Sequence, residues 1–283
     1  MKHLIINADD FGLHEQINKG IIKGFKEGII TSTSIMPTAP AFDEAVELAK
    51  QNPELGIGIH LTLCTCVPSC LPKSDVSSLL GADGNFLPSY VDFAKRYYTG
   101  RINSFELEAE LRAQFEKALN SGINITHIDS HQHTHMLPGI NSLVIELCKE
   151  YNIKRVRVPK EAYFFTGGYK VGLGRKIGRA GLSFCADLAK PNVSDAGLIT
   201  TDHFFGMLAG CNLDEELVGN IIKLLPDGTS ELMTHPGLSQ EILAKALPWE
   251  LHWENELAAM LSLKNKALLE ANHVTLTNFG RLD

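Results

Sequence analysis

The feature that most constrains the fold is a regular alternation of short β-branched runs with segments of helical spacing, which continues along nearly the whole chain. Such alternation predicts a parallel sheet, and eight repeats of it favour a closed or nearly closed barrel. We therefore predict an α/β fold, a (β/α) TIM-like barrel. The predicted strands are Leu4–Ala8, Thr33–Met36, Gly56–Leu63, Ile125–Asp129, Lys154–Val158, Ile199–Phe204, Ser230–Met233 and Val274–Thr277. The predicted helices are Ile17–Glu27, Phe42–Gln51, Ser104–Asn120, Ile140–Tyr151, Asp214–Leu225 and Glu254–Glu270.

The length of 283 residues is long for one ordinary core but typical of a single α/β barrel. No break in composition suggests a linker, so we predict a single domain over residues 1–283. Two long loop insertions interrupt the alternation, one from about Cys64 to Asn103 and one from about Pro159 to Leu198. Long insertions in a compact domain are typical of lids or binding walls. A Gly-x-Gly at 172–174 does not follow a predicted strand, so it is a weak indication of a nucleotide site.

The charge and hydropathy patterns exclude several classes of protein. The formal net charge is −7, so the basic surface that nucleic-acid binding needs is not indicated. No apolar run reaches the ~20 residues of a membrane helix. The first residues turn polar and acidic too soon for a signal peptide, so we expect a cytoplasmic protein. In that setting the six cysteines are expected to be reduced thiols.

The segment from 127 to 135 concentrates metal-binding side chains, since four of the eleven histidines and an aspartate lie within it. Imidazole and carboxylate are the usual ligands of borderline metals, whereas the alternative is a polar loop whose histidines face water. Strand alternation puts His127, Asp129 and His131 on one face. His131 lies nearest the predicted mouth and is the better candidate ligand. His133 and His135 are expected to line the cleft or to support the ligands from behind.

Other polar residues recur where the predicted strands end, and barrel enzymes build their sites at the carboxyl ends of strands. A polar residue that follows nearly every strand is the pattern that such a site requires. These residues are Asp9, Asp10, His60, His131, Arg157, Asp202, His203 and His235.

Each candidate residue also has a structural explanation. Asp9 and Asp10 could form a turn and cap the following helix, and His60 could be a core histidine with satisfied hydrogen bonds. His235, followed by proline and glycine, could belong to a simple turn. Arg157 could bind only a carboxylate inside the barrel. The sequence leaves these alternatives open.

Several short motifs, taken in order, resemble those of the YdjC-like carbohydrate deacetylases, the group that contains the chitooligosaccharide deacetylases. The resemblance extends from Leu4 to at least Gly237. Each motif alone is modest evidence, but the ordered set is highly specific. The residues that carry it are Asn7–Gly12, Thr31–Thr33, Gly58–Leu61, Thr126–His135 and Glu231–Gly237.

The resemblance implies an irregular (β/α) TIM-like barrel. It also implies one divalent metal ion held by Asp10, His60 and His131, with Asp9 as the catalytic base and His235 as the acid. Such a site would activate water and polarise an acetamide carbonyl while Asp9 accepts a proton and His235 protonates the leaving amine. Two histidines favour zinc, manganese or cobalt, but members of the family also use magnesium, so the ion is expected to be magnesium or zinc. Arg157 and His133 are the expected substrate-binding residues.

The resulting prediction is a metal-dependent hydrolase that removes acetyl groups from N-acetylated sugars, either short oligosaccharides or their phosphates. One alternative is a metal-dependent phosphoesterase or amidohydrolase on the same barrel. Another is a sugar-binding protein without turnover. Partners other than the sugar are not indicated, although barrels with apolar outer helices often form homodimers.

Overall fold

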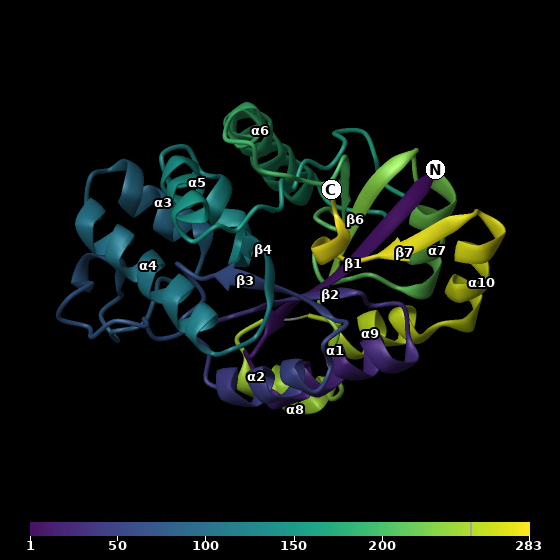
Figure 1. Ribbon diagram of the computed structural model, residues 1–283, viewed down its shortest axis with the longest axis horizontal. Helices are drawn as coiled ribbons and strands as arrows, with labels where there is room; N and C mark the ends of the chain where they lie inside the picture. Colours follow the sequence, from purple (N-terminus) through teal and green to yellow (C-terminus); the bar gives the residue numbers. More distant parts are fainter. Residues whose placement is uncertain (250) are drawn as a thin grey trace.

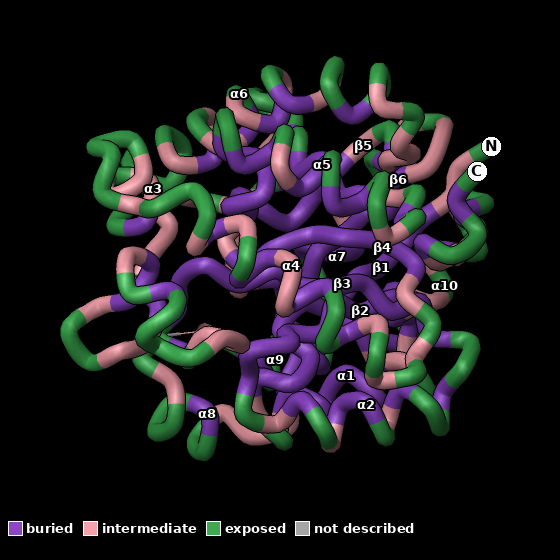
Figure 2. Tube along the Cα trace, turned by 60° about the vertical axis from the view of Figure 1, so that its left-hand side comes forward, coloured by how far each residue is buried: buried purple, intermediate pink, exposed green. Residues whose placement is uncertain are grey.

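The computed structural model describes residues 1–249 and 251–283 (Figure 1). Within them a curled parallel sheet runs in the order β4-β3-β2-β1-β6-β5, and β7 pairs with the first half of β1. The central strand β1 is buried from Leu4 to Phe11, as expected for a parallel strand covered on both faces (Figure 2). The strands are β1 (Lys2–Phe11), β2 (Ser32–Ile35), β3 (Gly56–Leu61), β4 (Ile125–Ser130), β5 (His203–Phe205), β6 (Gly228–Thr234) and β7 (Val274–Thr277).

The curl between β4 and β5 is completed by single bridges instead of a full strand. Val156 bridges to Ile128 of β4, and Arg155 bridges to Ile199, so both neighbours are reached through isolated pairs. The prediction of a strand over Lys154–Val158 was therefore wrong, and the strand expected over Ile199–Phe204 is reduced to β5. One physical reason is that Pro159, directly after the run, has no N–H to extend a ladder.

Amphipathic helices cover the sheet, with α1, α2, α8 and α9 together on one side of it in both views (Figures 1 and 2). The helix predicted over Glu254–Glu270 is two helices, because extended backbone at Ser262 ends the first and its hydroxyl caps the second. None of the described helices is both long and apolar enough to cross a membrane. The helices are α1 (Glu15–Glu27), α2 (Phe42–Lys50), α3 (Tyr90–Tyr98), α4 (Ser104–Asn120), α5 (Ile140–Glu150), α6 (Leu173–Asp195), α7 (Glu215–Leu224), α8 (Gln240–Ala246), α9 (Trp253–Leu261) and α10 (Leu263–Ala271), with short 3-10 turns η1 (Ser77–Leu79), η2 (His131–Met136) and η3 (Phe279–Arg281).

The two insertions are only partly loops. The first carries η1 and α3, and the buried carboxylate of Glu110 binds it by accepting the backbone N–H groups of Cys70 and Leu71. The second is filled by α6, so its description as a loop was wrong over 23 residues. Its glycines and Pro191 are poor helix formers, and tertiary placement outweighs that local propensity.

One hydrophobic cluster contains buried residues from Leu4 at one end of the chain to Val274 near the other. Strands and covering helices both contribute to it. The division of the chain into domains stays a prediction.

Candidate functional site

Four strands deliver the candidate residues to one rim of the sheet. Asp9 and Asp10 lie at the end of β1, His60 lies near the end of β3, and His131 and His235 directly follow β4 and β6. Adjacent residues of a regular strand point to opposite faces. The register between β1 and β2 shifts between residues 8 and 11, and Asp10 has a φ of 69°. This bulge lets two consecutive carboxylates reach the same site.

Asp10, His60 and His131 form a buried cluster of three ligand-type side chains whose donor atoms all lie within 4.8 Å of one another. The Asp10 Oδ1 atom is 2.8 Å from His131 Nδ1 and 3.4 Å from His60 Nε2. Ligand atoms that share one ion at ordinary bond lengths lie about 3.0–3.5 Å apart. Both Asp10 distances are close to this range, so the donor set fits one divalent ion.

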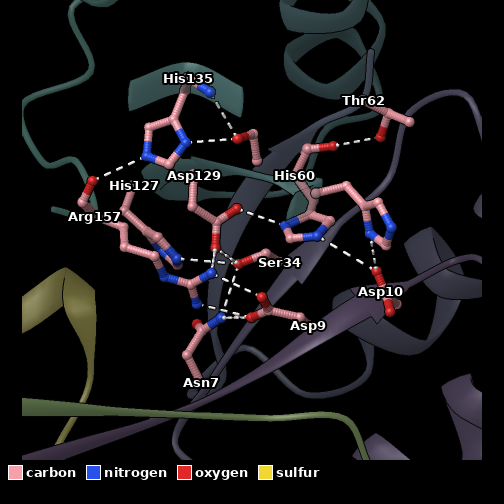
Figure 3. A network of polar contacts seen from close by, with 12 residues as sticks. Asn7, Asp9, Asp10, Ser34, His60, Thr62, His127, Asp129, His135 and Arg157 are labelled. Atoms are coloured by element: carbon pink, nitrogen blue, oxygen red, sulfur yellow. Dashed lines mark hydrogen bonds and ion pairs between the residues drawn. The ribbon is translucent and has the colours of Figure 1, made fainter. Parts of the chain in front are cut away.

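A carboxylate behind His60 fixes the orientation of its ring. His60 Nδ1 is 2.7 Å from Asp129 Oδ1, which leaves Nε2 directed toward Asp10 (Figure 3). Burial alone would lower the pKa of His60, but the charges and hydrogen bonds of Asp129 and Asp10 raise it to about 10. A carboxylate–histidine pair of this kind is the usual second layer of a metal site, because it selects the tautomer and strengthens the ligand.

Beneath this cluster one fully buried guanidinium joins three carboxylates, and Figure 3 shows its contacts with two of them, Asp9 and Asp129. Arg157 NH1 lies 2.7 Å from Asp9 and 2.8 Å from Asp129, and NH2 lies 2.7 Å from Glu231. Burial opposes ionisation of Asp129, yet Arg157 and His60 hold its pKa well below the ordinary value. Arg157 has 0% of its surface exposed and does not line the cavity, so the structure favours the carboxylate-binding role that the sequence left open.

The Asp9 carboxylate has one hydrogen-bond acceptor position that no described residue fills. Its two oxygens accept two N–H groups of Arg157 and one of Asn7, all at 2.7–2.8 Å. A carboxylate offers about four acceptor positions. Since Asp9 also lines the cavity, the remaining position is available to a group that enters it.

His235 is held at the rim by Glu256, a buried residue of α9. The Glu256 carboxylate accepts the His235 backbone N–H and the Thr234 hydroxyl, and its Oε2 lies 3.7 Å from His235 Nδ1. Burial alone would lower the pKa of His235, but the Cys211 sulfur and the Glu256 carboxylate raise it well above the ordinary value. Burial also raises the pKa of the Cys211 thiol.

The other histidines of the 127–135 segment have different surroundings. His133 lines the cavity, packs edge-on against Phe204, and burial holds its pKa well below the ordinary value. His135 bonds to the Ser130 hydroxyl and to the Arg157 carbonyl, so its ring supports the backbone. His127 is stacked on Phe279 below the site.

A cavity of about 450 Å³ opens over the cluster, within the usual range for a small-molecule site. Aromatic and apolar side chains contribute to its wall together with the polar residues. Trp249 stacks against His131 with ring centroids 5.6 Å apart. The lining residues are Asp9, Asp10, His60, Tyr90, His131, Gln132, His133, Gly174, Arg175, Gly178, Arg179, Leu182, Met207, Gly210, Cys211, Met233, His235, Trp249 and Leu251.

Sequence reasoning did not assign the partners of Asp129, and it missed Glu231 and Glu256, which complete this arrangement. Alternation along β4 places Asp129 on the same face as His127. This pattern indicates that Asp129 points inward, but it does not indicate which residue Asp129 binds. Glu231 and Glu256 carry no local signal, because their partners are distant in sequence. Asp202 and His203 do not join the site: Asp202 is exposed, and His203 bonds to a backbone carbonyl at Asp227.

The family model for YdjC-like proteins matches residues 3–271. The chain belongs to this family. A relative from Brevibacillus brevis is 31% identical over 289 residues, and one from Thermoanaerobacter pseudethanolicus is 29% identical over 285 residues. The first alignment covers 99% of this chain and 99% of the relative, and the second covers 100% of both. Both relatives are named carbohydrate deacetylase.

The fold of this YdjC-like protein is also found in a solved structure. A protein of Enterococcus faecalis, named for cellobiose-phosphate cleavage, superposes with a TM-score of 0.77 at 25% sequence identity. The match covers 98% of this chain and 97% of the other. The two proteins therefore share the same fold over nearly their full lengths.

Proposed function

We propose that this protein is a metal-dependent hydrolase that removes acetyl groups from N-acetylated sugars, either short oligosaccharides or their phosphates. The observation that carries the proposal is the buried cluster of Asp10, His60 and His131 at the floor of a cavity. Membership of a family whose named relatives are carbohydrate deacetylases supports the choice of reaction.

In this proposal Asp10, His60 and His131 hold one divalent ion, either zinc or magnesium. The ion supplies Lewis-acid activation of water and of the acetamide carbonyl. Asp129 keeps His60 in the tautomer whose Nε2 faces the ion, and Asp10 supplies the negative charge.

Proton transfer is assigned to two residues that line the cavity. Asp9 accepts a proton from the attacking water at its free acceptor position, while Arg157 and Asn7 fix the carboxylate. His235, kept protonated beside Glu256, donates a proton to the departing amine nitrogen. Amide cleavage requires this donation because the sugar nitrogen leaves readily as a neutral amine but very poorly as an anion. His133 contacts the bound sugar from the cavity wall.

Acetate release from N-acetylated chitooligosaccharides by the purified, metal-supplemented protein tests the function. We expect stoichiometric acetate and free amine. Release of inorganic phosphate from sugar phosphates with no acetate from any N-acetyl sugar would assign the site to the phosphoesterase alternative instead.

The role of His235 predicts a specific pH dependence. An acid must be protonated to act, so the activity it supports is present below its pKa and is lost as the pH rises through that value. Because the pKa of His235 is raised, the alkaline limb of kcat/KM is expected above the ordinary histidine range. Glu256→Gln removes one of the groups that raise this pKa and should move this limb to lower pH.

Glu254→Gln provides the matched control, since it makes the same change on an exposed position of α9. A limb that stays in place in Glu256→Gln would remove Glu256 from this role. His235→Ala should abolish the limb and impair an amide substrate far more than an ester analogue. Equal loss on both substrates would show that His235 binds substrate instead of donating a proton.

A further inference from the structure

The carboxyl group of Glu231 is a buried titratable group that the proposed chemistry does not use. Glu231 lies in the middle of β6, and 0% of its surface is exposed. It does not line the cavity, and within the described part of the chain its polar contacts are with Arg157, the residue that also holds Asp9. Glu231 can therefore influence the base through Arg157, but it cannot touch a substrate.

The contacts of the Arg157 guanidinium use all of its N–H groups. A guanidinium has five N–H donors in a planar fork. Nε and NH2 each lie 2.7 Å from Glu231 Oε1. NH1 and NH2 each lie 2.7 Å from an oxygen of Asp9, and NH1 lies 2.8 Å from Asp129 Oδ2. Glu231 is the partner of the Nε edge, so it fixes the plane in which the other two nitrogens reach Asp9.

The carboxyl groups around Arg157 differ in how their oxygens are used. NH1 and NH2 bind separate oxygens of Asp9, which is the forked geometry of an ionised carboxylate (Figure 3). Both oxygens of Asp129 also have partners, Oδ1 at His60 and Oδ2 at Arg157. Both contacts of Glu231 instead go to Oε1, and its buried Oε2 has no partner among the described residues. One oxygen that accepts two hydrogen bonds beside one that accepts none is the pattern of a protonated carboxylic acid.

The balance of charge in this cluster also favours a neutral Glu231. Among the described residues Arg157 is the cation that contacts Glu231 and Asp9, and it is shared with Asp129. Three ionised carboxylates around one guanidinium would leave excess negative charge away from water, and a buried charge without compensation favours protonation. Burial, with the charges of Asp9 and Asp129, raises the pKa of Glu231 to about 7, although Arg157 opposes this shift. The pKa of Asp129 is lowered, so Glu231 is the better site for a proton.

We propose that Glu231 is a neutral positioning residue for the base: its Oε1 holds the guanidinium of Arg157 in the orientation that Asp9 requires, while its Oε2 carries a proton. This rests on the proposed function, in which Asp9 accepts a proton from water. A neutral Glu231 does not compete for the positive charge, so Arg157 remains the counter-ion of Asp9. A glutamine at this position keeps the accepting carbonyl, whereas an alanine keeps neither contact.

The first experiment compares Glu231→Gln with Glu231→Ala in acetate release at about pH 6, above the ordinary pKa of glutamate and below that of Glu231. Glu231→Gln should retain kcat and KM. Glu231→Ala frees the Nε edge of Arg157 and should lower kcat about 10- to 100-fold with KM and metal content unchanged, because a displacement of about 1 Å in a catalytic group can have an effect of this size. Equal loss in the two variants, or no loss in Glu231→Ala, would overturn the proposal.

Two comparisons separate positioning of the base from a loss of stability. Glu110→Ala removes another fully buried carboxyl group, which accepts backbone N–H groups of the first insertion and does not line the cavity, so the folded fraction should keep its kcat. In the Asp9→Asn background, Glu231→Ala should cause little further loss, because the residue on which it acts has been removed. An equal loss of kcat in Glu110→Ala and Glu231→Ala, or the same effect of Glu231→Ala in both backgrounds, would contradict a role through Asp9.

Infrared spectroscopy detects the proton on Glu231 without any turnover, because a protonated carboxylic acid has a carbonyl-stretch band that a carboxylate lacks. At about pH 6, where an ordinary glutamate is ionised, the wild-type protein should show such a band. The band should be missing in Glu231→Gln and retained in Glu254→Gln, the control at an exposed position. This result would support the neutral Glu231 even if no substrate released acetate. Acetate release with no band that depends on Glu231 would leave the proposed reaction standing and overturn this proposal.

Discussion

Asp9→Asn is expected to bind metal nearly as the wild-type protein does and to lose turnover by a factor on the order of 10²–10⁴, the usual contribution of a general base. The substitution keeps the shape of the side chain but removes its ability to accept a proton. Arg157 retains its contacts with Asp129 and Glu231, so the fold should persist. Metal content and kcat measured on the same preparation check this result.

The matched control is Asp202→Asn, the same substitution at the start of another strand. Asp202 is exposed and accepts the Thr229 backbone N–H outside the cavity. It should leave both metal content and turnover unchanged. Loss of metal in Asp9→Asn equal to the loss of turnover would place Asp9 among the ligands and end its assignment as a base.

His60→Ala is expected to lower metal affinity by at least about 100-fold while the fold is retained. Loss of second-layer partners alone costs 10- to 100-fold, and His60 contributes a ligand directly. Asp129 would lose its histidine partner but would keep Arg157 at 2.8 Å and the Ser34 hydroxyl at 2.6 Å. Elemental analysis after dialysis, together with a circular dichroism spectrum, measures both parts of the expectation.

His273→Asn serves as the comparison for a histidine outside the site. His273 is exposed and has a φ of 53°, a conformation that asparagine tolerates well. The variant should retain its full metal content. Stoichiometric metal in His60→Ala would remove His60 from the ligand set.

The sequence predicted the strand–helix alternation well, because buried parallel strands form continuous apolar runs with polar residues where they end. It also brought Asp10, His60 and His131 together correctly, since the carboxyl ends of parallel strands share one rim. It failed at Lys154–Val158, where a strand-like run makes only single bridges. It also predicted a loop where α6 forms, because glycine has a low helix propensity.

The residues behind the site could not be assigned from the sequence. Asp129 binds His60 from 69 positions away, and Arg157 binds Glu231 from 74 positions away. No local pattern encodes such pairing. Arg157 was expected at the cavity because it lies near the end of a predicted strand. Its guanidinium is instead fully buried among carboxylates beneath the cavity. Glu256 reaches His235 from a different helix. Specific partners of buried charges depend on the complete fold.

The most direct measurement of the central claim is a metal titration of the metal-free protein with acetate release as the signal. The proposed site predicts that activity rises in proportion to added zinc or magnesium and reaches its plateau at one ion per chain. His60→Ala should show no rise at the same concentrations. Acetate release that does not depend on metal, or a plateau at two ions per chain, would contradict the proposed single-metal site.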